Sequence, residues 1–375
     1  ARVAGVPSSE HAAEMTRLYI EDTDRLGIGR PDAEPLATQT MAEIVALIEV
    51  LIEKGHAYES GGDVYFSVRS FPGYGKLSNR DPDQMDQGEE AGTASLKRDQ
   101  LDFALWKARK PGEDAYWDSP WGEGRPGWHI ECSAMAEKLL GADFEVHGGG
   151  SDLIFPHHEN EVAQSEAARG ERLARIWMHN GMVRIADEKM SKSVGNIFQL
   201  AEALDRFGAP AIVAYLGSGH YRQPLEFSEG ALEEAAARVE RIRNFLRLPA
   251  EDSPGEVDPV ASDALDAFLE ALCDDFNTPR AYAALFGLIA EANRRRVPCA
   301  RAAVAEMLPL LGLEALLAGE AGPDAEAERL LAEREEARRE RDFERADELR
   351  ARLEAAGWEV RDGPAGPELV PSGGG

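Results

Sequence analysis

The segment that decides the fold of this chain lies between residues 127 and 161. It contains Gly-Trp-His-Ile-Glu-Cys at 127–132, Phe-Glu-Val-His-Gly-Gly-Gly-Ser-Asp-Leu at 144–153 and Phe-Pro-His-His-Glu-Asn-Glu at 155–161. From residue 144 onward the pattern indicates a strand, a glycine loop, a helix and a further strand. That order is typical of the second half of a parallel α/β sheet, in which a glycine loop lets the backbone approach a ligand closely. We therefore predict an α/β fold.

The same segment gathers candidate metal ligands. Five of the eight histidines fall between residues 129 and 179, together with one of only three cysteines. Pro156 predicts a helix start, and on that helix His157 and Glu161 would project from one face because they are four residues apart. With Cys132 they form a set of thiolate, imidazole and carboxylate, which suits zinc better than calcium or magnesium. The alternative is that Cys132 is a small buried hydrophobe and that His157 and His158 only cap a helix.

A second motif is Lys-Met-Ser-Lys-Ser at 189–193. The chain has eight lysines, of which two lie in this pentapeptide and none follows Lys192. Two ammonium groups separated by small hydroxyl residues suit a polyphosphate whose charge must be stabilised during transfer. The alternative is a solvated surface turn.

Together these motifs resemble the cysteinyl-tRNA synthetase family. The pentapeptide at 189–193 matches a signature loop of class I aminoacyl-tRNA synthetases, and the segments around 127–135 and 147–161 are similar to those of the cysteine enzyme. The resemblance extends over nearly all of the chain. It implies the remainder of a class I Rossmann-like catalytic domain with an insertion, then an α-helical bundle and a small C-terminal domain. It also implies an enzyme that uses ATP, with Mg²⁺, to join cysteine to tRNA(Cys).

The resemblance further implies a zinc-dependent choice of amino acid. Zn²⁺ would be bound by Cys132, His157 and Glu161 and would hold the substrate thiolate directly. Serine offers a harder oxygen that ionises poorly, so it would bind zinc much less well. This matters because a pocket that senses one methylene discriminates by only about 10–200-fold. Trp128 would line the substrate pocket.

The remaining implied roles concern ATP. Lys192, helped by Lys189, would be catalytic, since it would stabilise the phosphates in the adenylation transition state. The ATP site would also include Gly149 and Asp152. For Asp152 the interpretation stays open, because this side chain could pair with an adenosine or amino-acid group or simply cap the following turn.

Two features of the family do not occur in this sequence. Class I synthetases carry an early His-x-Gly-His phosphate-binding turn, and the cysteine enzyme has a further zinc-ligand cysteine just before it. The sequence contains no His-x-Gly-His, and no cysteine precedes Cys132. We therefore expect an N-terminally truncated chain that is inactive alone and keeps three protein ligands for zinc.

Two alternative functions stay open. One is the mycothiol-pathway ligase that joins cysteine to a glucosaminyl-inositol, because it shares the zinc residues and the lysine loop. It needs no anticodon module, so the segment Asp-Phe-Asn-Thr-Pro at 275–279 and a long charged helix at 333–356 favour the tRNA enzyme. The other is a truncated, non-catalytic paralogue that binds tRNA or zinc.

Composition and the resemblance together predict six parts of the chain. These are the remainder of the first half of the nucleotide-binding fold (1–39), a connective insertion (40–122), the second catalytic half with the zinc site (123–180), the lysine loop with a stem-contact region (181–230), a tRNA-binding helical bundle (231–320) and a C-terminal anticodon-binding module (325–375).

Net charge and cysteine content limit which binding partners and which cell compartment are expected. The net charge of −28 opposes broad contact with nucleic acid, so tRNA is expected to meet restricted basic patches such as 294–296 and 338–341. No apolar run is long enough to span a membrane. Three widely spaced cysteines form no disulfide framework, which indicates a cytoplasmic protein. We expect a monomer.

Four further predictions concern individual helices and hairpins. Thr40 and Glu43 form a capping box for a helix that ends at Lys54. Residues 57–66 predict a hairpin around two glycines, and a second small hairpin is expected from 358 to 370. Between them, residues 333–356 are expected to form one helix with an apolar stripe that includes Phe343, Ala346, Leu349 and Leu353.

Overall fold

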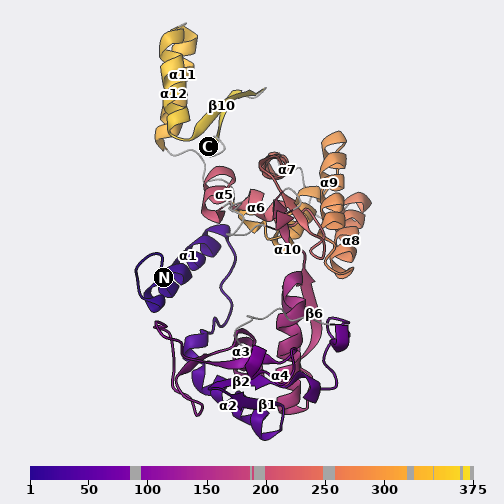
Figure 1. Cartoon of the computed structure of the whole chain (residues 1–375). Helices are drawn as coiled ribbons and strands as arrows, with labels where there is room; N and C mark the ends of the chain where they lie inside the picture. Colours follow the sequence, from indigo (N-terminus) through magenta and orange to yellow (C-terminus); the bar gives the residue numbers. More distant parts are fainter. Residues whose placement is uncertain are drawn as a thin grey trace. The chain divides into compact units, whose positions relative to one another are not determined.

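The computed structural model describes residues 1–84, 94–185, 188–189, 199–247, 258–318, 325–340, 342–363 and 366–371. The chain divides into two compact units (Figure 1). The first comprises Ala1–Tyr19 and Arg30–Met182, and the second comprises Ile20–Gly29 and Val183–Gly375. The division falls inside helix α1 (Ser8–Leu26). In the described part of the chain, no helix combines the length and the apolar character that crossing a membrane requires.

The first unit contains a four-stranded antiparallel sheet with the order β1–β2–β3–β4. β1 (Ala57–Ser60) and β2 (Asp63–Phe66) form the predicted hairpin. All four residues of β2 are buried. Phe66 stacks on Phe103 with ring centroids 5.0 Å apart, which ties β2 to its neighbour. The other two strands are β3 (Phe103–Ala108) and β4 (Gly124–Pro126).

Helix α2 (Met41–Glu53) covers this sheet with an apolar stripe. Its buried residues are Ile44, Leu47, Ile48 and Leu51, each at most 2% exposed, and their spacing is that of one helix face. The helix is confirmed, but the predicted capping box is wrong. The Thr40 hydroxyl donates to the carbonyl of Leu36, 3.0 Å away, and makes no cap bond to the helix.

A parallel pair of strands follows this sheet along the chain. β5 (Phe144–Gly150) pairs with β6 (Ala174–Asn180), and helix α4 (Glu159–Arg169) lies between them along the chain. The predicted order of strand, helix and strand is therefore confirmed. The predicted glycine loop is corrected: residues 148–150 belong to β5 itself, paired with Met178, His179 and Asn180. The glycines thus form the carboxyl end of a parallel strand, where α/β proteins commonly bind ligands.

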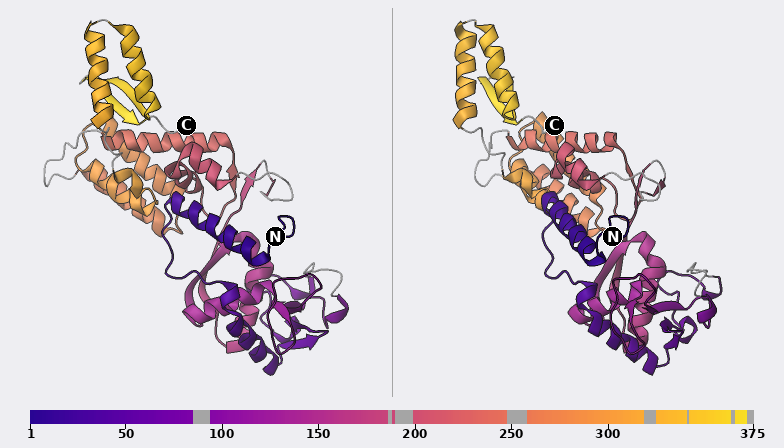
Figure 2. Two further views of the ribbon diagram at one scale, coloured as in Figure 1. Left: turned by 90° about the vertical axis from the view of Figure 1, so that its left-hand side faces the viewer. Right: turned by 60° about the vertical axis from the view of Figure 1, so that its left-hand side comes forward.

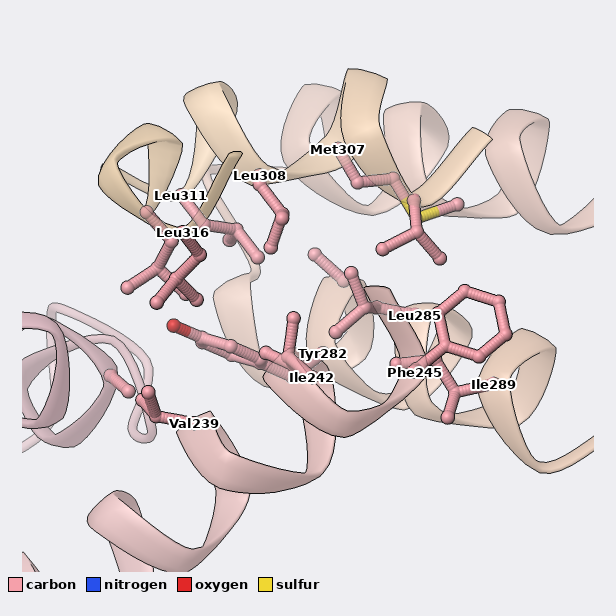
Figure 3. Close-up of a cluster of buried hydrophobic side chains, with 14 of the residues drawn as sticks. Val239, Ile242, Phe245, Tyr282, Leu285, Ile289, Met307, Leu308, Leu311 and Leu316 are labelled. Atoms are coloured by element: carbon pink, nitrogen blue, oxygen red, sulfur yellow. The ribbon is translucent and has the colours of Figure 1, made fainter. Parts of the chain in front are cut away.

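The second unit is mostly helical. Its core joins α7, α9 and α10 with the chain that follows α10, and Figure 3 shows Ile242, Leu285 and Met307 directed toward a common centre. Asn277 starts α9 by accepting a hydrogen bond from the backbone N–H of Arg280. The elements are β7 (Val183–Ile185), β8 (Glu188–Lys189), α5 (Leu200–Phe207), α6 (Ala209–Leu216), β9 (Leu225–Phe227), α7 (Glu229–Arg247), α8 (Pro259–Cys273), α9 (Thr278–Arg294) and α10 (Ala300–Leu310).

The C-terminal segment forms two helices, not the predicted single one. α11 (Ala325–Glu340) and α12 (Phe343–Ala355) pack side by side (Figure 2). Asp342 has non-helical angles (φ −84°, ψ 80°), and its carboxylate accepts from the backbone N–H of Arg345. It therefore starts a new helix within the charged run. Leu349 and Leu353 pack in one cluster with Leu330, whereas Phe343 is 63% exposed and does not join the stripe.

The predicted second hairpin closes this module. β10 (Trp358–Gly363) pairs antiparallel with β11 (Gly366–Pro371). α12 contacts β10 and α11 contacts β11, so the hairpin packs on the helix pair. Val360 is buried in the same small apolar cluster as Leu353. The module thus has its own core, as expected for a separate domain.

Candidate metal centre

Three elements of the first unit bring the predicted metal ligands together. Cys132 lies in α3 (Trp128–Leu140), and His157 lies in a single wide turn, Ile154–His158, that precedes α4. Glu161 lies in the first turn of α4, which begins at Glu159 and not at the predicted Pro156. One ligand atom from each of the three residues lies within 4.8 Å of the other two. That spacing suits a single ion, whose bonds to such atoms are about 2.0–2.3 Å long.

Gly127 fixes where α3 begins. Its N–H donates to the carbonyl of Leu105, 2.8 Å away, so the start of the helix lies directly against β3. A Cβ at position 127 would meet the carbonyl oxygen of Ala104 at 2.0 Å. Only glycine permits this close approach. The position of Cys132 on α3 therefore depends on a contact between two backbones.

Each of the adjacent histidines before α4 has a histidine partner. His157 Nδ1 lies 2.9 Å from His129 Nδ1, and His158 Nδ1 lies 2.8 Å from His179 Nε2. These contacts fix the ring orientations and leave the Nε2 atom of His157 directed toward Glu161, 2.8 Å away. A second partner at the opposite nitrogen is the usual support of a metal-bound imidazole. Burial lowers the pKa of His129 to about 3 and that of His158 to about 4, so both rings are neutral near pH 7.

Glu161 is the most constrained member of the cluster. Its Oε1 lies 2.8 Å from His157 Nε2 and its Oε2 lies 3.2 Å from His147 Nε2. Neither approach is aligned as a hydrogen bond, so both buried oxygens lack a hydrogen-bond donor among the described residues. Burial acts to raise the pKa of Glu161, and the close His147 and His157 nitrogens act to lower it. A buried, ionised carboxylate without donors is costly unless a cation neutralises it.

The third residue of the group is Cys132, whose thiol has a raised pKa. Burial, with smaller contributions from the nearby Glu161 and Glu131, raises the pKa of its thiol to about 12. The protein alone therefore keeps this group as a thiol, and only a cation at the cluster would favour the thiolate. The soft and borderline donors and the carboxylate without donors fit Zn²⁺.

The other predicted site residues are less tightly grouped. Trp128 is 59% exposed, and its ring centroid lies 4.4 Å from that of His157, so it flanks the metal ligands. Gly149 lies in β5, where a Cβ would meet His158 Cε1 at 2.8 Å. Asp152 is exposed in the turn Ser151–Leu153. Lys189 is the last residue of β8, but its side chain and all of Lys192 lie outside the described residues.

Three histidines of the cluster were not among the predicted site residues. His129, His147 and His179 contact His157, Glu161 and His158 respectively. The signal that marks them was present in the sequence, because five of the eight histidines lie between residues 129 and 179. Their separate roles were not visible, since they come from α3, β5 and β6.

Replacing Gly127 with Ala is expected to displace the start of α3 and lower both stability and zinc content. The new methyl group would overlap backbone atoms of β3, which cannot rotate away. Such overpacking costs about 1–3 kcal/mol or more. Denaturant unfolding and elemental analysis measure the two effects. Gly29→Ala is the matched control, because a Cβ there meets nothing within 4 Å. Equal stability of the two variants would contradict the close contact.

Three family patterns match successive parts of the chain. Residues 1–237 match the pattern of the tRNA synthetases class I (C) catalytic domain. Residues 267–312 match the DALR domain. Residues 321–366 match the cysteinyl-tRNA ligase anticodon binding domain. The first of these patterns covers more than half of the chain.

Curated relatives are similar over most of their length. A cysteine–tRNA ligase of Halorhodospira halophila is 48% identical over 379 residues, which cover 96% of this chain and 81% of the relative. One of Alkalilimnicola ehrlichii is 47% identical, with the same two coverages. Among solved structures, Mycobacterium tuberculosis methionyl-tRNA synthetase in complex with methionyl-adenylate aligns with a TM-score of 0.58 at 17% identity. That alignment covers 84% of this chain and 78% of the other, and it bears on the fold alone.

Proposed function

Because the chain belongs to the cysteinyl-tRNA synthetase family of class I aminoacyl-tRNA synthetases, we propose roles for its residues in that family's reaction. The reaction is cysteine–tRNA ligation. The cysteine carboxylate attacks the α-phosphorus of ATP and releases pyrophosphate, and a terminal ribose hydroxyl of tRNA(Cys) then displaces AMP from the adenylate. The class I catalytic domain and the anticodon-binding domain account for these substrates.

The observation that carries the proposal is the group Cys132–His157–Glu161, in which His157 and Glu161 are buried and both carboxylate oxygens lack donors among the described residues. These three residues would hold Zn²⁺. When bound there, Zn²⁺ supplies a Lewis acid that prefers the thiolate of cysteine to the hydroxyl of serine. His129 orients the ring of His157 through the Nδ1 contact of 2.9 Å. His147 lies 3.2 Å from the second oxygen of Glu161 and helps to position that carboxylate.

Trp128 forms a wall of the cysteine pocket in this proposal. Its indole lies against His157 and is largely exposed, so a substrate could cover it. Gly149 lets the strand end pass close to His158. The exposed Asp152, directly after the glycines of β5, is proposed to pair with an adenosine or amino-acid group. Lys192 and Lys189 would contact the phosphates of ATP, with Mg²⁺. This assignment depends only on the positive charge of the two side chains.

The C-terminal module and the helical core are proposed to recognise tRNA over limited areas. The basic cluster at 294–296 is partly neutralised, since Arg295 forms ion pairs with Asp258 and Glu291, each at 2.8 Å. Phosphate contacts there would have to displace these carboxylates, which fits a restricted interface in a chain of net charge −28. We further propose a monomer in the cytoplasm, because tRNA charging takes place there and Cys132, Cys273 and Cys299 form no disulfide.

The test measures amino-acid choice and acceptor choice in the full-length protein. Cysteine should support ATP–pyrophosphate exchange at least about 10⁴-fold better than serine, because a site built around the thiolate leaves serine without its main contact. Cysteine should then be transferred to tRNA(Cys) and not to a glucosaminyl-inositol acceptor. Transfer to the amino sugar would establish the alternative ligase. Zinc-bearing protein that activates cysteine and serine equally would refute the proposed zinc role.

A further inference from the structure

A second group of candidate metal ligands lies beside the first. One ligand atom from each of His147, His158 and Glu161 lies within 4.8 Å of the other two. The two groups share only Glu161, and they take different oxygens of it. Oε1 faces His157 at 2.8 Å, whereas Oε2 faces His147 at 3.2 Å. A carboxylate with its two oxygens directed at two different nitrogens is suited to bridge two cations.

The two groups are built in the same way. His157 and His158 are adjacent, both are buried, and the Nδ1 atom of each is held by a further histidine. The partner of His157 is His129, and the partner of His158 is His179. The opposite ring nitrogen, Nε2, is therefore the atom that each imidazole would offer to a cation. Holding one ring nitrogen orients the other and sets its tautomer, which is how proteins prepare an imidazole for metal binding.

Close neighbours restrict the rings of the second group, and solvent still reaches one of them. Trp177 packs against both His147 and His158, with ring centroids 4.8 and 5.3 Å apart respectively. The strand passes His158 at Gly149, where any Cβ would lie 3.1 Å from Nε2. His147 is on β5 with 16% of its side chain exposed, so solvent reaches the group. The end of β5 thus passes close to His158.

We infer that His147, His158 and Glu161 form a second metal position, which takes a divalent cation of the zinc type and is bridged to the first position by Glu161. Two nitrogens and one oxygen are borderline donors that suit Zn²⁺, Co²⁺ or Ni²⁺. The set lacks a thiolate, so it binds Zn²⁺ more weakly than the group that contains Cys132. A cation held by His147 and His158 would compete with the first position for the carboxylate of Glu161, so raised zinc should inhibit the enzyme. The inference shares Glu161 with the zinc site proposed above but does not depend on the reaction.

The experiment titrates the metal-free, full-length protein with Co²⁺ alone, following both stoichiometry and absorption. We expect two Co²⁺ ions per chain. The first should produce a thiolate-to-cobalt charge-transfer band, and the second should add only d–d absorption. His147→Ala should reduce the stoichiometry to one and keep the charge-transfer band. Cys132→Ser should remove that band and keep the ion held by His147 and His158. His11→Ala, which changes a histidine outside the cluster, is the matched control and should bind two.

The outcomes separate the two sites. One ion in the native protein, with its affinity reduced by His147→Ala, would mean that His147 only positions Glu161, and the second site would be overturned. A single ion that survives Cys132→Ser and is lost in His147→Ala would support the second site and overturn the first. Absence of any bound ion in the native protein would overturn both. As a further check, excess Zn²⁺ should inhibit pyrophosphate exchange of the native protein and inhibit His158→Asn less, as a fraction of each protein's own rate without added Zn²⁺.

Discussion

Cys132→Ser is expected to remove tightly bound zinc and cysteine activation together. Serine replaces a soft thiolate with a hydroxyl that ionises poorly, so the first site loses the donor that most favours zinc. Loss of an outer-shell partner alone typically costs 10–100-fold in metal affinity or activity, and loss of a ligand should cost at least about a hundredfold. Elemental analysis and cysteine-dependent pyrophosphate exchange measure both effects. The matched control is Cys273→Ser, which changes an exposed, unpaired cysteine outside the first unit.

The raised thiol pKa gives this prediction a pH signature. Because the pKa of Cys132 is about 12 without a cation, the thiol is protonated throughout the range near neutrality. Binding of zinc must then expel that proton, so the thiol alone should make zinc affinity rise about tenfold for each pH unit between pH 6 and 8. In Cys132→Ser this part of the slope should disappear. A Cys132→Ser protein that retains zinc and full activity, or an unchanged slope, would show that Cys132 is not a ligand.

Lys192→Ala is expected to slow cysteine-dependent pyrophosphate exchange by about a hundredfold while leaving cysteine binding nearly unchanged. The ammonium group is needed most where phosphate charge reorganises in the transition state, so its loss should fall on turnover. Removal of one such preorganised charge costs on the order of 3 kcal/mol. Because Lys192 lies outside the described residues, this prediction depends on the sequence motif and the family.

Steady-state exchange kinetics and cysteine titration separate the two effects of this variant. Lys110→Ala serves as the control, since Lys110 is exposed in the turn after β3 and belongs to no proposed site. Lys189→Ala should give a smaller loss than Lys192→Ala, in keeping with its supporting role. An unchanged exchange rate in Lys192→Ala would mean that the lysine pentapeptide is a structural turn and takes no part in catalysis.

Several features of the fold followed from local pattern. The hairpin of β1 and β2 follows from alternating apolar residues around two glycines, and the α2 helix follows from its apolar stripe. The order of β5, α4 and β6 follows from the same kind of periodicity. Where prediction failed, a competing local contact decided. Thr40 donates a hydrogen bond back to Leu36 instead of capping α2. Asp342 caps a new helix, in which Leu349 and Leu353 pack in one cluster with Leu330.

The sequence by itself determined the chemistry of the candidate site. It supplied a thiol, imidazoles and a carboxylate, and the four-residue spacing of His157 and Glu161 brought two of them together, because the wide turn that holds His157 leads directly into α4. Only the tertiary structure decided that Cys132 on α3 joins them and that Glu161 lies between His157 and His147. It also decided that His129 contacts His157 and that His179 contacts His158, since His129 and His179 lie on separate elements. Sequence spacing governs contacts within one helix, whereas contacts between elements depend on packing, such as the backbone approach at Gly127 that places α3 against β3.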